Sequence, residues 1–193
     1  EELSAGYDGW AETYDKDVLS FGYLIPAVLS GYVGLHIPAG NTPILDAGAG
    51  TGLLGQILAL VGYTNLVGID LSQGMLDVAE KKNAYKKLRQ MELGKPLDFA
   101  DEEFAAVISG GVFTQGHAPA DSFDELLRIT RPGGHIIFSA RTDVYANEGL
   151  TQKLDSLEKA GLWKLVQKTP NFQSLPIGEP EVMGQVFVYQ KTA

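Results

Sequence analysis

Residues 43–55 constrain the fold of this chain more than any other segment. A short apolar run ends at Asp46, glycines follow at the alternate positions Gly48, Gly50 and Gly52, and an apolar-periodic segment begins directly after them. This order predicts a strand, a tight turn and the start of a helix. Glycines let a ligand approach main-chain N–H groups, and a helix N-terminus adds a positive end, so we expect a nucleotide-like ligand at this turn.

Two cofactor classes use such a turn, and the spacing of the glycines discriminates between them. The dinucleotide fingerprint needs Gly or Ala where this chain has Leu53, and the third glycine stands one place earlier, which weakens an NAD assignment. The run D-A-G-A-G-T-G instead resembles the first motif of class I S-adenosylmethionine-dependent methyltransferases, whose glycine turn holds the methionine end of the cofactor. The resemblance implies cofactor contacts from Asp46, Gly48, Ala49, Gly50, Thr51 and Gly52.

A second short apolar run, residues 66–70, ends at Asp70. A carboxylate at the carboxyl end of the neighbouring strand can accept hydrogen bonds from both ribose hydroxyls. Dinucleotide-binding enzymes also have an acidic residue at this position, so Asp70 predicts a ribose and does not distinguish between the two cofactors. The alternative is that Asp70 caps a helix starting near Ser72. The resemblance implies that Leu71 and Met75 pack on the adenine, although Met75 can equally belong to the core.

Further segments extend the resemblance over nearly the whole chain. A Pro-Gly-Gly turn within residues 131–139 ends one helix and begins a β-branched strand, as before the family's fifth strand. Glu92 and Leu93 match the family's adenine-binding positions, where Asp is more frequent, so a direct contact from the longer Glu92 stays open. With residues 7–18, the sequence looks closest to the methyltransferase-like family named after the Williams-Beuren syndrome chromosome region.

The coarse pattern predicts a single methyltransferase domain over residues 1–193, in which residues 1–40 form an N-terminal helical lid and packing segment. Strands are expected at 43–46, 66–70, 90–93, 105–109, 135–139, 163–168 and 184–190, and helices at 53–61, 73–88, 120–129 and 151–160. This alternation predicts a doubly wound, mostly parallel seven-stranded α/β sheet of the Rossmann-like class I methyltransferase type. The proline-rich connection 169–183 cannot supply a crossover helix, so the last strand is expected to be antiparallel.

The acceptor is expected at the carboxyl ends of the fourth and fifth strands, where open parallel sheets bind ligands. Ser109 and Gly110, at the end of the fourth strand, are assigned to the cofactor. His117 is a candidate general base, against the plainer interpretation of a surface-loop histidine. After the fifth strand, Arg141 either clamps an acceptor carboxylate or pairs with Asp143.

Tyr7, Trp10 and Tyr14 lie on one face of a predicted N-terminal helix, at i, i+3 and i+7. A core stripe is the plain interpretation. In related small-molecule enzymes such a segment lies over the cofactor as a lid, so the resemblance implies that Tyr14 covers the cofactor and Trp10 faces the acceptor.

Composition narrows the classes of partner. The formal net charge of −9 argues against nucleic acid, and the basic run within residues 81–89 is expected to be a solvated helix face. Without cysteine there is no thiolate chemistry, and His36, His117 and His135 lack a metal-ligand spacing, so no metal is expected. No membrane span or signal segment is recognised, which predicts a cytoplasmic protein, although the missing initiating Met leaves room for a preceding segment.

Three functions remain open from the sequence. The favoured one is methyl transfer from S-adenosylmethionine to a small-molecule acceptor, with S-adenosylhomocysteine as product. The alternatives are a protein methyltransferase, for which the acidic charge suits a basic substrate, and a cofactor-binding module without catalysis.

Overall fold

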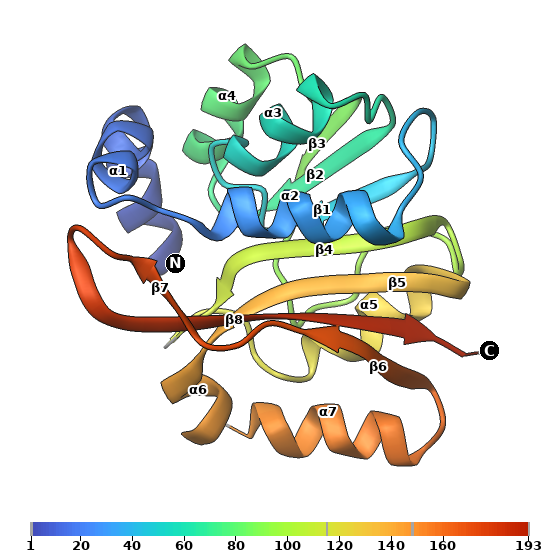
Figure 1. The fold of residues 1–193 in the computed structure, drawn as a ribbon. Helices are drawn as coiled ribbons and strands as arrows, with labels where there is room; N and C mark the ends of the chain where they lie inside the picture. Colours follow the sequence, from blue (N-terminus) through green and yellow to red (C-terminus); the bar gives the residue numbers. More distant parts are fainter. Residues whose placement is uncertain (1, 115, 148, 193) are drawn as a thin grey trace.

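A computed structural model describes residues 2–114, 116–147 and 149–192, which build one mixed sheet between two layers of helices (Figure 1). The strands run in the spatial order β3-β2-β1-β4-β5-β8-β6, with β7 paired to β8. Their bounds are β1 Ile44–Ala47, β2 Leu66–Asp70, β3 Lys87–Gln90, β4 Phe104–Phe113, β5 Thr130–Arg141, β6 Trp163–Lys168, β7 Phe172–Leu175 and β8 Glu179–Lys191.

The first five strands are parallel, and β8 is antiparallel to β5, β6 and β7. The central strand β1 is buried along its whole length, with Ile44 opposite Leu66 of β2 and Ala106 of β4. A continuous apolar run is what a strand covered on both faces requires. The predicted doubly wound, mostly parallel sheet with an antiparallel last strand is therefore confirmed.

Helices cover both faces of the sheet, and a hydrophobic cluster lies under each layer (Figure 1). Leu29 of α2 and Leu58 of α3 belong to one cluster, and Phe123 of α5 and Leu154 of α7 belong to the other. The helices are α1 Glu2–Ser20, α2 Ile25–His36, α3 Leu53–Leu60, α4 Gln73–Lys81, α5 Ser122–Ile129, α6 Thr142–Asn147 and α7 Leu150–Lys159.

Several bounds differ from the expected ones. The sheet has eight strands, because part of the proline-rich connection 169–183 forms the short strand β7 and pairs with β8. Helix α4 ends at Lys81 rather than near residue 88, since Asn83 adopts a φ of 52° and turns the chain toward β3. As a result β3 begins at Lys87, and Glu92 and Leu93 lie beyond its end.

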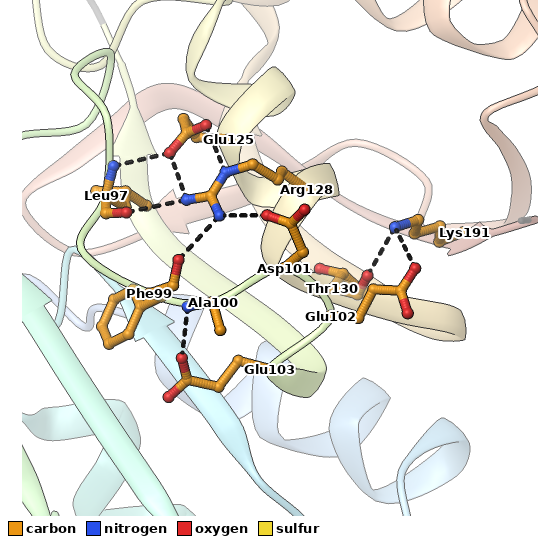
Figure 2. A network of polar contacts seen from close by, with 10 residues as sticks. All are labelled: Leu97, Phe99, Ala100, Asp101, Glu102, Glu103, Glu125, Arg128, Thr130 and Lys191. Atoms are coloured by element: carbon orange, nitrogen blue, oxygen red, sulfur yellow. Dashed lines mark hydrogen bonds and ion pairs between the residues drawn. The ribbon is translucent and has the colours of Figure 1, made fainter.

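The loop between β3 and β4 is fixed to α5 by the Arg128 guanidinium (Figure 2). This group donates hydrogen bonds to the Glu125 and Asp101 carboxylates and to the carbonyl oxygens of Leu97 and Phe99, over 2.7–2.9 Å. The paired carboxylates raise the pKa of Arg128, so the guanidinium stays charged. Because Arg128 holds two carbonyls of one loop, it stiffens the segment that carries the predicted adenine-binding residues.

Over the described residues, no single helix is long and apolar enough to cross a bilayer. Helices α1 and α2 reach that length and apolar content only when taken together, and they are bent by 82° relative to each other.

Candidate cofactor and acceptor site

The glycine turn between β1 and α3 adopts a backbone that only glycine accommodates without strain. Gly48, Gly50 and Gly52 have φ values of 86°, 54° and 83°. A Cβ at Gly48 would lie 2.2 Å from a methyl carbon of Val112, so a side chain there is also excluded sterically. The Gly48 N–H donates to the Ile69 carbonyl at 2.8 Å, which anchors the turn to the end of β2.

Asp70 braces this turn and also faces a cavity. Its carboxylate accepts hydrogen bonds from the N–H groups of Gly50 at 2.8 Å and Ser72 at 2.9 Å, and burial raises its pKa. Capping of α4 falls mainly to Ser72, whose hydroxyl accepts from the Met75 N–H at 3.0 Å.

Three cavities lie at this edge of the sheet, and the largest of these three, called the largest cavity below, has a volume of about 300 Å³. It brings together residues predicted from three separate motifs: the glycine turn, the segment after β2 and the segment after β3. Tyr14 and Gly110 complete its wall from α1 and β4. The predicted residues that line it from the three motifs are Gly48, Gly50, Asp70, Leu71, Met75, Glu92 and Leu93.

A smaller cavity of about 50 Å³ lies on the α3 side of the turn, with Asp46, Ala49 and Thr51 among its lining residues. The Asp46 carboxylate is almost fully buried, and burial raises its pKa to about 7. The Tyr85 hydroxyl donates to it at 2.6 Å. Gly52 is the N-cap of α3 and does not line these cavities.

A third cavity, of about 180 Å³, lies between α1, β5 and the β7–β8 hairpin. We call it the acceptor chamber because the sequence predicts an acceptor near the carboxyl ends of β4 and β5. Four aromatic side chains line it, together with aliphatic ones such as Val182 and Leu175. Tyr7 and Tyr14 also line the largest cavity, so the two spaces share a wall. The four aromatic residues are Tyr7, Trp10, Tyr14 and Tyr23.

Sequence reasoning missed the chamber's far wall. Tyr23 belonged to a segment expected only to pack on the sheet, and the β7 strand that carries Leu175 was not expected. Glu179 and Val182 enter the chamber from β8 because that strand is longer than predicted. The strand β7 has one aromatic residue, Phe172, and no β-branched residue, so the sequence carries only a weak signal for another strand.

Helix α1 is fastened across the cavities by polar contacts on the α4 side. The Asp8 carboxylate accepts hydrogen bonds from the Ser72 hydroxyl at 2.6 Å and the Gly74 N–H at 2.9 Å. Asp15 accepts from the Thr51 hydroxyl and pairs with Lys82. The Lys82 side chain is only 13% exposed, so it does not belong to a solvated helix face as expected.

On the opposite side, α1 contacts the loop after β4 through His117. The Tyr7 hydroxyl lies 2.8 Å from Nε2 of His117, and the Thr114 hydroxyl lies 2.8 Å from Nδ1. His117 lines the largest cavity and not the acceptor chamber. Because both ring nitrogens have partners and the ring is outside the chamber, this geometry does not favour a general base.

Two of the remaining predicted residues line a cavity, and one is buried beneath the site. Trp10 lines the acceptor chamber and its indole N–H donates to Asp17 at 2.7 Å, so it is not a core residue. Arg141 lines the chamber as well and forms two hydrogen bonds with Asp143, at 2.7 and 3.1 Å. Ser109 is a correction: it is fully buried, donates to the Ala47 carbonyl and lines none of the three cavities.

No group of three or more His, Asp or Glu side chains that could hold a metal ion occurs within residues 2–114, 116–147 and 149–192.

Comparison with known sequences identifies related methyltransferases. Residues 45–138 match the family described as "Methyltransferase domain". The human protein named Methyltransferase-like protein 27 is 35% identical over 164 residues, covering 82% of this chain and 66% of that protein. A demethylmenaquinone methyltransferase from Symbiobacterium thermophilum is 31% identical over 140 residues, covering 68% of this chain and 55% of that protein. The chain thus spans less than two thirds of both relatives.

Solved structures share the fold at low sequence identity. A chain from the complex between the Haloferax volcanii Trm112 methyltransferase activator and its methyltransferase superposes with a TM-score of 0.72 at 15% identity, covering 97% of this chain and 98% of the other. An S-adenosylmethionine-dependent methyltransferase from Thermotoga maritima gives 0.69 at 16% identity, covering 96% and 98%.

Proposed function

Because the chain belongs to the class I S-adenosylmethionine-dependent methyltransferases, we propose that it transfers the cofactor's methyl group to a small-molecule acceptor held in the acceptor chamber. The observation that carries this proposal is the shared wall of the two larger cavities. Tyr7, Tyr14 and Gly111 line both the largest cavity and the chamber. A ligand in one space therefore lies next to a ligand in the other.

The chemistry of the cavity walls fits the cofactor. Asp70 offers a carboxylate to the ribose hydroxyls, and the apolar side chains of Leu71, Met75 and Leu93 flank the adenine. Asp46 is a buried carboxylate, and none of the described cations contributes to its pKa. A buried carboxylate is stabilised by a paired positive charge, and the ammonium group of a ligand can supply it. Asp46 and the glycine turn therefore receive the amino-acid end of S-adenosylmethionine.

The bound cofactor would supply an electrophilic methyl group. The chain's own residues position the acceptor and exclude water from the reacting atoms. Trp10, Tyr14 and Tyr23 hold the acceptor in an apolar space against the wall shared with the cofactor cavity. Alignment and exclusion of water are the contributions that an in-line displacement needs most. Burial raises the pKa of Tyr14 and of Tyr23, so both phenols stay neutral and act as hydrogen-bond donors to the acceptor.

The charged residues at the chamber favour an acceptor without a strong negative charge. Arg141 is paired with Asp143, and Glu179 lines the same space. The carboxylates beside Arg141 raise its pKa and offset its positive charge. Arg141 therefore acts as a wall residue paired with Asp143, and the alternative clamp on an acceptor carboxylate has less support.

Helix α1 is the lid of the site. Asp8 and Asp15 fasten it to α4 and to the glycine turn, while Tyr7 fastens it to His117 across the cavity. Contacts on both sides of the cavity keep water from the reacting atoms. Cofactor exchange then requires α1 to release at least one side.

The test is methyl transfer from S-adenosylmethionine labelled in its methyl group. The purified protein is incubated separately with a metabolite extract below about 3 kDa, enriched in aromatic quinol-type compounds, and with a protein lysate. Those aromatic compounds are chosen because one relative is a demethylmenaquinone methyltransferase. Label in the small-molecule fraction supports the proposal. Label in protein alone establishes the protein-methyltransferase alternative, and cofactor binding without transfer to either establishes the non-catalytic module.

A further inference from the structure

Tyr85 fills a space that the surrounding glycines leave open. It follows α4, in the connection to β3, and its ring enters between α3 and β2. A Cβ at Gly55 would lie 2.2 Å from the Tyr85 hydroxyl oxygen, and one at Gly52 or Gly68 would lie 3.1 Å from a ring carbon. A side chain at Gly55 would therefore overlap the ring, and one at Gly52 or Gly68 would press closely against it.

The phenol ends on the Asp46 carboxylate. The Tyr85 hydroxyl donates to Oδ2 of Asp46 at 2.6 Å, and Tyr85 itself does not line the small cavity. Asp46 lines that cavity together with Gly48, Gly50 and Thr51 of the glycine turn. One oxygen of this cavity-lining carboxylate is thus held by a residue that does not line the cavity.

We infer that Tyr85 is a positioning residue, whose hydroxyl holds the Asp46 carboxylate in place to receive the ammonium group of the cofactor's amino-acid end. The inference rests on the proposed use of S-adenosylmethionine and extends it to a residue outside the cavity. Tyr85 does not contact the cofactor. It acts through Asp46, and the glycines at 52, 55 and 68 leave room for its ring.

The charge balance around Asp46 supports this role. Burial raises the pKa of Asp46 to about 7, and the Tyr85 hydrogen bond opposes that rise because it stabilises the carboxylate. Without the hydroxyl, a larger fraction of Asp46 is protonated at neutral pH and cannot pair with an ammonium group. The other titratable or charged groups around Asp46 and its turn are Asp70 from β2, Tyr23 before α2, Tyr14 from α1 and the Asp15–Lys82 pair beside Thr51.

The experiment compares two ligands that differ only at the amino-acid end. S-adenosylhomocysteine carries the ammonium and carboxylate, whereas 5′-methylthioadenosine keeps the adenosine and lacks both. The variant Tyr85→Phe keeps the ring and removes the hydroxyl. We expect about tenfold weaker binding of S-adenosylhomocysteine by calorimetry, the factor for one hydrogen bond to a charged group, and less than about twofold change for methylthioadenosine.

Two controls separate positioning from general destabilisation. Tyr63→Phe removes another buried tyrosine hydrogen bond, from the Tyr63 hydroxyl to the Ile37 carbonyl at 2.7 Å, and should lower stability without changing either affinity. In an Asp46→Asn background, Tyr85→Phe should cause no further loss of S-adenosylhomocysteine affinity. The gap between wild type and Tyr85→Phe should also narrow from about pH 7 to about pH 8.5, where Asp46 is ionised in both.

Equal losses for the two ligands, an unchanged affinity for both, or a loss that persists beside Asp46→Asn would each overturn the inference. A wild-type protein that binds methylthioadenosine and not S-adenosylhomocysteine would overturn it too. Failure of the wild type to bind either ligand would instead overturn the assignment of the cofactor, which makes the two failures distinguishable.

Discussion

Replacing Asp70 with alanine should weaken both cofactor binding and the fold, by separable amounts. The carboxylate lines the largest cavity, where we propose that it accepts from the ribose hydroxyls, and it also accepts from the Gly50 and Ser72 N–H groups. Loss of hydrogen bonds to a charged group costs about 1.5–3 kcal/mol, so the dissociation constant of S-adenosylhomocysteine should rise about 10- to 150-fold. Two N–H groups without their acceptor should lower the unfolding free energy by about 1–3 kcal/mol, or roughly 2–12 °C in Tm.

Calorimetric titration and thermal unfolding measure the two effects on the same samples. Asp70→Asn serves as a second variant, because its amide oxygen can still accept one of the two N–H groups and so preserves more of the fold. Asp77→Ala is the matched control, since this exposed carboxylate on α4 accepts only from the Gln73 side chain among its hydrogen bonds to described residues. Unchanged cofactor affinity in Asp70→Ala would refute the ribose contact and leave Asp70 as a brace for the glycine turn.

Three further predictions concern the lid helix α1, the buried carboxyl group of Asp46 and the Arg128 guanidinium that holds the loop between β3 and β4. Tyr14→Ala should raise the dissociation constant of S-adenosylhomocysteine about tenfold or more, because the ligand loses apolar cover. His117→Ala should raise this constant severalfold and leave turnover at saturating cofactor unchanged. A large turnover defect in His117→Ala would instead support His117 as a general base. Burial raises the pKa of Asp46 to about 7, so between about pH 4 and pH 7 the folded state binds a proton that the unfolded state releases. The free energy of unfolding without ligand should therefore fall as the pH rises from about 4 to about 7. Urea titrations should show a flatter dependence for Asp46→Asn. Arg128→Met should cost about 1–2 kcal/mol of stability and weaken S-adenosylhomocysteine binding a few-fold. Lys153→Met, which removes ion pairs from α7 to Asp121 and Asp124 at the start of α5, should leave binding unchanged.

Local backbone chemistry made it predictable that most of the residues assigned to the cofactor meet at one edge of the sheet. The glycines of the turn and the acidic ends of β1 and β2 each mark a position where a strand ends and the chain must bend. Parallel pairing then brings Asp46 and Asp70 to the same edge, because the carboxyl ends of parallel strands coincide. The expected fold followed from the same alternation of strands and helices.

The acceptor half could not be derived in this way. Its walls come from α1, from Tyr23 and from the β7–β8 hairpin, which lie far apart in the sequence and meet only after folding. Tyr85 escaped notice for a related reason: the prediction extended α4 through it, whereas the positive φ of Asn83 ends the helix and directs the ring under α3. Neither feature has a periodic signal in the sequence.

The most direct test of this account is an experimental structure of the protein with S-adenosylhomocysteine bound. We predict that the ribose hydroxyls lie within hydrogen-bond distance of Asp70, that the amino-acid end lies at Asp46 and the glycine turn, and that the sulfur faces the chamber lined by Trp10 and Tyr14. A ligand bound in the reverse direction, with its amino-acid end at Glu92, or a sulfur atom directed away from the chamber, would contradict the account.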